Sequence, residues 1–146
     1  MSDKSGWKQI FHDFNLVGLR SGRETNTGLH VHINRSFLAN EQIKKIDLFV
    51  NYYRSLFEKL SRRTSNHYAE YNIKGIRQWG HSTTDRYSSV NFENTHTVEF
   101  RTFNGTNDID EFFASLQLVH AVALFVDKIS YEDFYENKQE VTKKFK

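Results

Sequence analysis

The strongest constraint on the fold of this chain is an alternation of apolar and polar residues in two short segments. Such a period of two is typical of a β-strand that has one buried face. In residues 28–34, His30, His32 and Asn34 share one face and the intervening apolar residues share the other. The sequence therefore predicts a strand that presents two imidazoles to solvent or to a cavity.

The second alternating segment places charged side chains on a strand. With a period of two, Glu99, Arg101 and Phe103 share one face, and Val98 and Phe100 share the opposite face. A carboxylate and a guanidinium therefore join the imidazoles on the polar faces of strands whose other faces form a core. This combination suits an anion, a metal ion or both.

A period near 3.6 residues predicts helices elsewhere in the chain. Residues 7–14 form a short amphipathic helix, and residues 40–63 form a long one with Asn40 as the N-cap. Residues 108–129 are apolar on most sides, so we expect that helix to be largely buried. Ser130 then begins a final helix through a capping arrangement.

Two further strands are predicted over residues 86–92 and 96–103, joined by a hairpin loop at residues 93–95. The predicted fold class is α+β, with a small, mainly antiparallel sheet packed against two long helices. We expect residues 1–146 to form a single domain, since no linker or repeat is visible.

The composition excludes several classes of protein. The chain has no cysteine, which excludes disulfides, thiolate metal sites and cysteine nucleophiles. A net charge of +2 gives no strong attraction to nucleic acid or to a membrane surface. We see no signal peptide and no apolar run of the roughly 18 residues that a membrane span needs. We therefore expect a cytoplasmic protein without a membrane partner.

The polar residues of the two strands are the candidate site. His30 and His32, two residues apart on one face, are close enough to share a metal ion or to hydrogen-bond one phosphate. Glu99 can bind Mg²⁺ or Mn²⁺ through oxygen, and Arg101 suits a bidentate contact with a carboxylate or phosphate. Taken separately, the His30/His32 pair and the Glu99/Arg101 pair are also common on the solvent-exposed face of an ordinary strand.

Four motifs follow one another within residues 27–129: Thr27-Gly28-Leu29-His30-Val31-His32-Ile33, Arg86-Tyr87 with Val90-Asn91, Thr97-Val98-Glu99-Phe100-Arg101, and Gly105-Thr106. In this order and spacing they resemble the amidoligase family. That family belongs to the carboxylate–amine ligases related to glutamine synthetase and glutamate–cysteine ligase. The resemblance implies the C-terminal half of a glutamine-synthetase-like catalytic fold.

The resemblance also implies a chemistry, which is ATP-dependent joining of a carboxylate to an amine through an acyl phosphate. It implies that His30 and His32 face the phosphate groups of the cofactor ATP or a metal ion, and the amide of Asn91 is a further candidate for a neutral contact with ATP. It further implies that Glu99, together with the two histidines, binds Mg²⁺ or Mn²⁺.

The same resemblance makes Arg101 and Arg86 the catalytic positions, where they steady the transferring phosphoryl group or the substrate carboxylate. Members of this superfamily carry an earlier strand with a Glu-x-Glu pair that supplies further metal ligands, and this chain contains no Glu-x-Glu. We therefore expect an amidoligase-like domain that is incomplete or inactive as an isolated chain. A homodimer or a second chain could complete the site.

Two other functions remain open from the sequence. The first is a phage or mobile-element protein that reuses the truncated fold for binding, for example as an inhibitor of a host nuclease or CRISPR-type defence complex. Its partner would be a protein or a nucleoprotein. The basic residues available for that contact are Arg20, Arg23, Arg35, Lys44, Lys45, Arg54, Arg62, Arg63, Arg77 and the terminal lysines. The second is a metal-dependent hydrolase that uses His30, His32 and Glu99.

Overall fold

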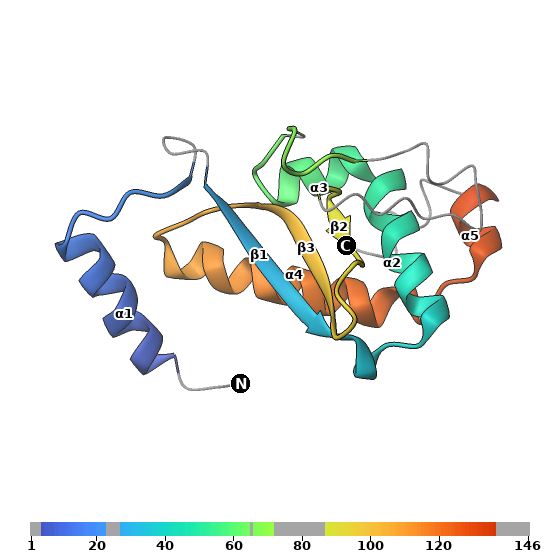
Figure 1. Cartoon of the computed structure of the whole chain (residues 1–146), viewed down its shortest axis with the longest axis horizontal. Coiled ribbons are helices and arrows are strands. Elements are labelled where there is room, and N and C mark those ends of the chain that lie inside the picture. The colour runs from blue at the N-terminus through green and yellow to red at the C-terminus, as the bar shows by residue number, and fades with distance from the viewer. Residues whose placement is uncertain (1–3, 23–26, 65, 72–86, 137–146) are drawn as a thin grey trace.

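The computed structural model has the α+β class that the sequence predicts. It describes residues 4–22, 27–64, 66–71 and 87–136. Within these residues, three antiparallel strands form a sheet of order β1-β3-β2 (Figure 1). The strands are β1 (Gly28–Asn34), β2 (Val90–Asn91) and β3 (Thr97–Asn104).

Helices cover one side of this sheet. They are α1 (Ser5–Leu16), α2 (Asn40–Tyr52), α3 (Arg54–Leu60), α4 (Ile109–Val126) and α5 (Tyr131–Glu136), with a short 3-10 helix η2 (Arg35–Phe37) after β1. Helix α4 runs behind the strands in Figure 1 and contacts β1, while α2 packs against α4. Helix α1 lies at the other end of the molecule, where it contacts the beginning of α4.

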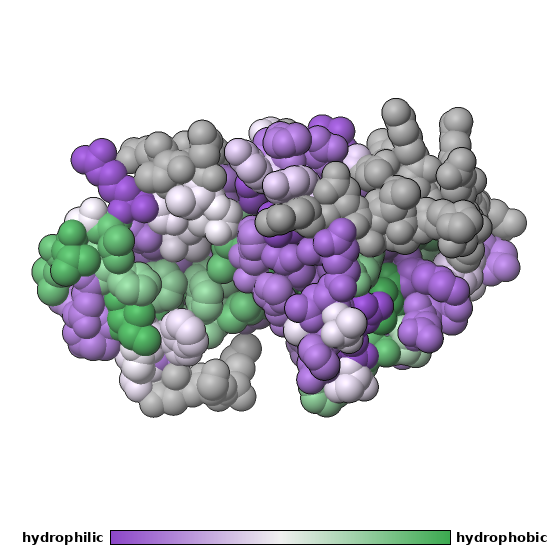
Figure 2. Space-filling view, in the orientation of Figure 1, coloured by the Kyte–Doolittle hydropathy of each residue, from purple (hydrophilic) through white to green (hydrophobic). Residues whose placement is uncertain are grey.

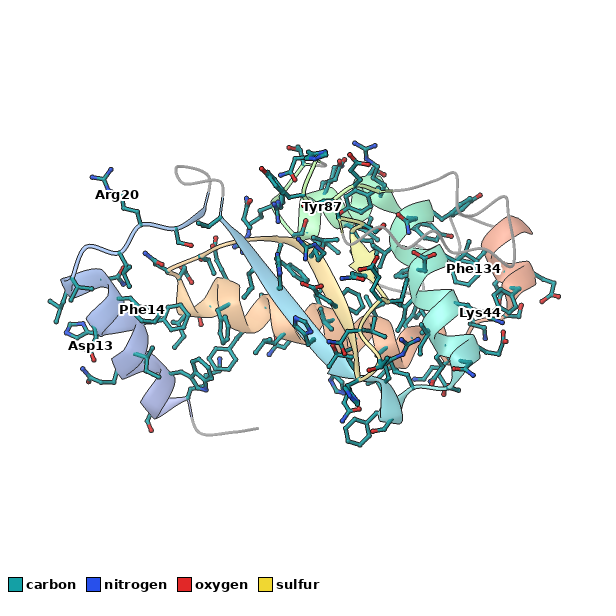
Figure 3. All side chains as sticks on the ribbon, viewed as in Figure 1. Asp13, Phe14, Arg20, Lys44, Tyr87 and Phe134 are labelled. Carbon is teal, nitrogen blue, oxygen red and sulfur yellow. The ribbon has the colours of Figure 1, made fainter. Side chains whose placement is uncertain are left out.

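The core lies between the sheet and the helices, and Phe49 of α2 is central to its aromatic contacts. The centre of its ring is 5.0 Å from that of Tyr53 and 5.5 Å from that of Phe57. It also lies 5.2 Å from Phe125 of α4 and 6.2 Å from Phe134 of α5, which points into the same region in Figure 3. Because each aromatic side chain buries a large apolar area, this cluster fixes α2, α4 and α5 against one another.

Three predictions about individual helices can be compared with the structure. The helix predicted over residues 7–14 is present as α1. The N–H of Ser130 donates to Asp133 Oδ2 (2.8 Å) and the N–H of Asp133 donates to Ser130 Oγ (3.2 Å), so the predicted capping arrangement is confirmed. At α2, Ala39 occupies the N-cap position instead of Asn40, a difference of one residue.

The prediction of one continuous helix over residues 40–63 is wrong. Helices α2 and α3 are separated at Tyr53, whose backbone leaves the helical region with φ −98° and ψ 30°. Tyr53 is only 2% exposed, and both Tyr53 and Phe57 contact the ring of Phe49. The bend therefore directs the apolar side chains of both helices into one core, which the helical period alone does not indicate.

Helix α4 is less buried than its apolar sequence predicts. Its fully buried stripe consists of Ser115, Val119, Val122 and Val126, whereas Leu124 is 55% exposed. The helix is also 18 residues long with a hydropathy of 1.5, so by length and composition it could cross a membrane, contrary to our expectation that no segment reaches that length. In the structure it packs against α2 and β1.

Strand β3 contains one residue more than the facing part of β1. Val31 pairs with Phe100 and Leu29 pairs with Phe103, so one residue of β1, His30, faces two residues of β3. This arrangement is a β-bulge, which bends the strand and reverses the side-chain alternation beyond it.

The bulge overturns one prediction about the faces of the sheet. Phe103 does not share a face with Glu99, because the extra residue turns it into the core with Val98 and Phe100. Thr102, inside the bulge, is also buried. The polar face of β3 is therefore limited to the part of the strand before the bulge.

Asp47 on α2 is a half-buried carboxylate close to this core. Its Oδ1 accepts a hydrogen bond of 2.6 Å from Asn51 Nδ2, and Asn51 Oδ1 accepts one of 3.3 Å from the hydroxyl of Ser89. Burial raises the pKa of Asp47 to about 6, although the hydrogen bond from Asn51 acts in the opposite direction. The ionised form is therefore disfavoured in the folded protein.

The variant Asp47→Asn should remove a pH dependence of stability. Since the pKa is about 6 in the folded state and about 4 in the unfolded state, the carboxyl stabilises the fold below pH 4 and this contribution is lost as the pH rises through 6. Asparagine keeps the acceptor for Asn51. The variant should match the wild type near pH 4 and exceed its free energy of unfolding by about 2–3 kcal/mol at pH 7.5. Urea denaturation of both proteins at pH 4 and pH 7.5 measures the difference in their free energies of unfolding. The same difference at both pH values would contradict the prediction.

Candidate functional site

The sheet brings the predicted polar residues together around Glu99. In the strand register, Glu99 on the central strand β3 pairs with His32 on β1 and with Asn91 on β2. Residues opposite one another on neighbouring strands point to the same face. Five of the six predicted site residues are thus brought to one face. The sixth, Arg86, lies outside the described residues.

The Glu99 carboxylate is bonded through both oxygens. Its Oε1 lies 2.7 Å from His30 Nδ1 and 2.9 Å from Arg101 Nη1, and its Oε2 accepts a bond of 2.9 Å from Asn91 Nδ2. His32 Nε2 is more distant, at 3.8 Å from Oε1. Only 10% of the Glu99 side chain is exposed, so these partners replace the water that a buried charge loses.

His30 is held in a defined protonation state. Burial lowers its pKa, and the nearby guanidinium of Arg101 lowers it further, while the Glu99 carboxylate acts in the opposite direction. His30 is therefore neutral at pH 7. Because a carboxylate oxygen can only accept, the proton resides on Nδ1 and the lone pair on Nε2. The Glu99 carboxylate thus orients an imidazole whose Nε2 can accept a proton or a metal ion.

His32 has a different second contact. Its Nδ1 is 3.0 Å from Oγ1 of Thr97, a residue of β3 that was not predicted to belong to the site although it shares the period of Glu99 and Arg101. The side chains of His30 and His32 are 37% and 46% exposed. Both imidazoles are therefore anchored on one side and open to a ligand on the other.

Arg63, which the sequence offered only as a surface cation, is buried beside this site. Its Nη1 donates to the carbonyls of Arg101 (3.0 Å) and Phe103 (3.2 Å), at either side of the bulge in β3, and its Nη2 lies 3.5 Å from Asn66 Oδ1. Arg63 therefore satisfies backbone carbonyls of β3 that the irregular hydrogen-bond ladder at the bulge leaves without a backbone partner. No sequence period could have identified it, because it lies in the turn after α3.

A divalent cation does not fit the described donors. Mg²⁺ and Mn²⁺ prefer several oxygen ligands, and Glu99 is the one carboxylate of this cluster, with both oxygens already bonded. No group of three His, Asp or Glu side chains in the described part of the chain is arranged to hold a metal ion. The guanidinium of Arg101 is instead suited to an anion, and His30 Nε2 donates to one once that imidazole is protonated.

Most of the basic residues proposed for a nucleic-acid surface have partners within the chain. Arg35, Lys44, Lys45, Arg54 and Arg62 contact, respectively, the carbonyl of Phe92, Glu41, the carbonyl of Ile129, Glu58 and Glu111. Arg23 and Arg77 lie outside the described residues, as does the basic C-terminal segment. Among the described members of that set, Arg20 is an exposed cation, and it extends into solvent in Figure 3.

Comparison of the chain with family models, curated proteins and solved structures finds no match in any of the three. The geometry of the site therefore provides the basis for a functional assignment.

Replacement of Arg63 should destabilise the bulge. Arg63→Lys keeps the charge but lacks the planar guanidinium that reaches two carbonyls and an amide, so we expect the free energy of unfolding to fall by about 1–3 kcal/mol. Gly28→Ala should act in the same direction, since its Cβ would lie 2.5 Å from Arg63 Nη1. The control Arg54→Lys, in a partly exposed ion pair, should change stability by less than about 0.5 kcal/mol. Wild-type urea midpoints for both site variants would refute this role.

Proposed function

We propose that this chain is an amidoligase-like domain, half of a glutamine-synthetase-like catalytic fold, that binds the phosphate groups of ATP on the polar face of β1 and β3. The observation that supports this most is the convergence of His30, His32 and Arg101 around the buried carboxylate of Glu99. These residues sit on strands, so their donors are positioned before a ligand arrives.

The charges of the cluster favour an anion. Arg101 and the buried Arg63 provide two positive charges against the single negative charge of Glu99, and His30 is neutral at pH 7. Arg101 uses Nη1 for Glu99 and Nε for the carbonyl of Tyr68, at 3.3 Å. Among the described residues its Nη2 has no hydrogen-bond partner, so Nη2 can donate to a phosphate oxygen.

The isolated chain is not a complete ligase in this proposal. Phosphoryl transfer requires cations that neutralise charge on the phosphate oxygens. Both oxygens of Glu99 are bonded to protein partners, so Glu99 does not by itself provide a site for such a cation. The missing carboxylates would come from a second chain or a second copy. Arg101 would then steady the transferring group, and His30 Nε2 would accept a proton beside it.

Substitutions of Arg101 and Glu99 test the anion site. Arg101→Ala should weaken ATP binding about 10–100-fold, the effect of losing a charge-assisted hydrogen bond. The control Lys44→Ala removes an equal charge from an exposed pair on α2 and should leave affinity unchanged (Figure 3). Glu99→Gln should strengthen metal-free binding several-fold, because it removes the negative charge. Calorimetry with and without Mg²⁺ measures all four proteins. Absence of wild-type binding at millimolar ATP would refute the proposal.

Anion binding should also depend on pH through His30. Because its pKa is lowered in the free protein, a bound dianion must raise that pKa, and binding then takes up a proton. Affinity for sulfate, which does not titrate in this range, should therefore increase as the pH falls from 8 to 6. The variant His30→Gln should lose this dependence. An unchanged slope in the variant would exclude His30 as the titrating group.

A further inference from the structure

Within the described part of the chain, the outer edge of β1 is unpaired. The strand order β1-β3-β2 places β1 at one side of the sheet, and in residues 4–22, 27–64, 66–71 and 87–136 no strand pairs with its other side. An edge strand presents unpaired N–H and C=O groups, which form a template for a further strand.

The hydrogen-bond pattern shows which groups face the open edge. The N–H of Arg35 donates to the carbonyl of His96, and pairs in an antiparallel ladder alternate between bonded and non-bonded. Val31 and Ile33 therefore direct their backbone groups to β3. His30 and His32 direct theirs outward. The residues whose imidazoles line the polar face thus also offer their backbone to a partner.

This edge lacks the features that usually prevent pairing. Residues 28–34 contain no proline, lysine or carboxylate, and the bulge lies in β3 on the opposite side. The strand is also seven residues long, which is enough for a stable pairing. The sequence of β1 is therefore compatible with addition of another strand.

Apolar side chains are exposed on α1 and just after β1. Helix α4 contacts both α1 and β1, and on α1 the side chains of Trp7, Ile10 and Phe14 are 39%, 42% and 38% exposed. Figure 2 shows apolar surface over the α1 end of the molecule, next to the polar central part. At the other end of β1, Phe37 is 80% exposed. On β1 itself Leu29 and Ile33 are only partly buried, so a docked strand would find apolar contacts on that face.

The charge around the edge is positive. Arg20 precedes the strand and Arg35 follows it, while Arg101 lies on the neighbouring strand β3. The buried Arg63 contacts β3 as well. On β1, β3 and the described segments 19–22 and 35–37 that flank β1, the one carboxylate is Glu99. This excess is complementary to acidic side chains.

We propose that the open edge of β1 takes up an extended segment of a partner protein as a fourth strand. The segment alternates apolar residues, directed toward α4, with acidic residues, directed toward the polar face. Main-chain hydrogen bonds to His30 and His32 supply affinity, and the alternating side chains supply specificity. This interaction goes beyond the proposed anion site and does not depend on it.

A synthetic peptide tests the interaction directly. The probe is a capped nine-residue peptide of alternating valine and glutamate, and the charge control alternates valine and lysine. We expect the lysine peptide to bind at least tenfold more weakly. At saturation with the glutamate peptide, amide exchange at His30 and His32 should slow at least tenfold. A third peptide, N-methylated at alternate positions, should not bind because it cannot pair. Equal affinities for the three peptides, or unchanged exchange, would overturn the proposal.

Two variants of one residue provide a matched test on the protein. His32→Pro removes both the imidazole and the outward N–H, whereas His32→Ala removes only the imidazole. The proline variant should bind the glutamate peptide at least tenfold more weakly than the alanine variant, and equal affinities would count against strand addition. If sedimentation shows a dimer whose His30 and His32 amides are already protected without peptide, the occupant is a second copy and the proposal is wrong.

Discussion

One extra residue in β3 determines where the polar and apolar side chains of this sheet lie. Before the bulge, Glu99 and Arg101 face outward, and after it Phe103 enters the core. A regular strand would place Phe103 on the polar face beside Glu99 and would expose a large apolar ring. The bulge persists because Arg63 donates to the carbonyls on both sides of it. The site and the core therefore depend on the same irregularity.

The buried carboxylate of Glu99 is the second requirement of this arrangement. A carboxylate removed from water is costly unless cations and donors replace the lost hydration, and here Arg101, His30 and Asn91 do so. These partners come from all three strands, so their bonds to the Glu99 carboxylate link the strands across the polar face of the sheet. The Glu99 carboxylate also fixes the tautomer of His30, so it determines that Nε2 carries the lone pair that faces a ligand.

The sequence was sufficient for the residues that obey a simple period. Alternation placed His30 and His32 on one face, and the hairpin between β2 and β3 brought Asn91 to Glu99. It was insufficient where long-range packing decides. The break at Tyr53 depends on a core that α2 and α3 share, and Arg63 acts on a bulge 38 residues away in the chain. Neither the break at Tyr53 nor the role of Arg63 produces a recognisable pattern in the neighbouring sequence.

The two proposals act on the same pair of residues, and this has a thermodynamic consequence. His30 and His32 offer their side chains to an anion and their backbone to an added strand. Acidic side chains of that strand would neutralise the charge of Arg101 that an anion also needs, so each ligand would weaken the other by the same factor. The sheet would then hold either a free phosphate group or a partner's acidic strand, because both draw on a single excess of positive charge.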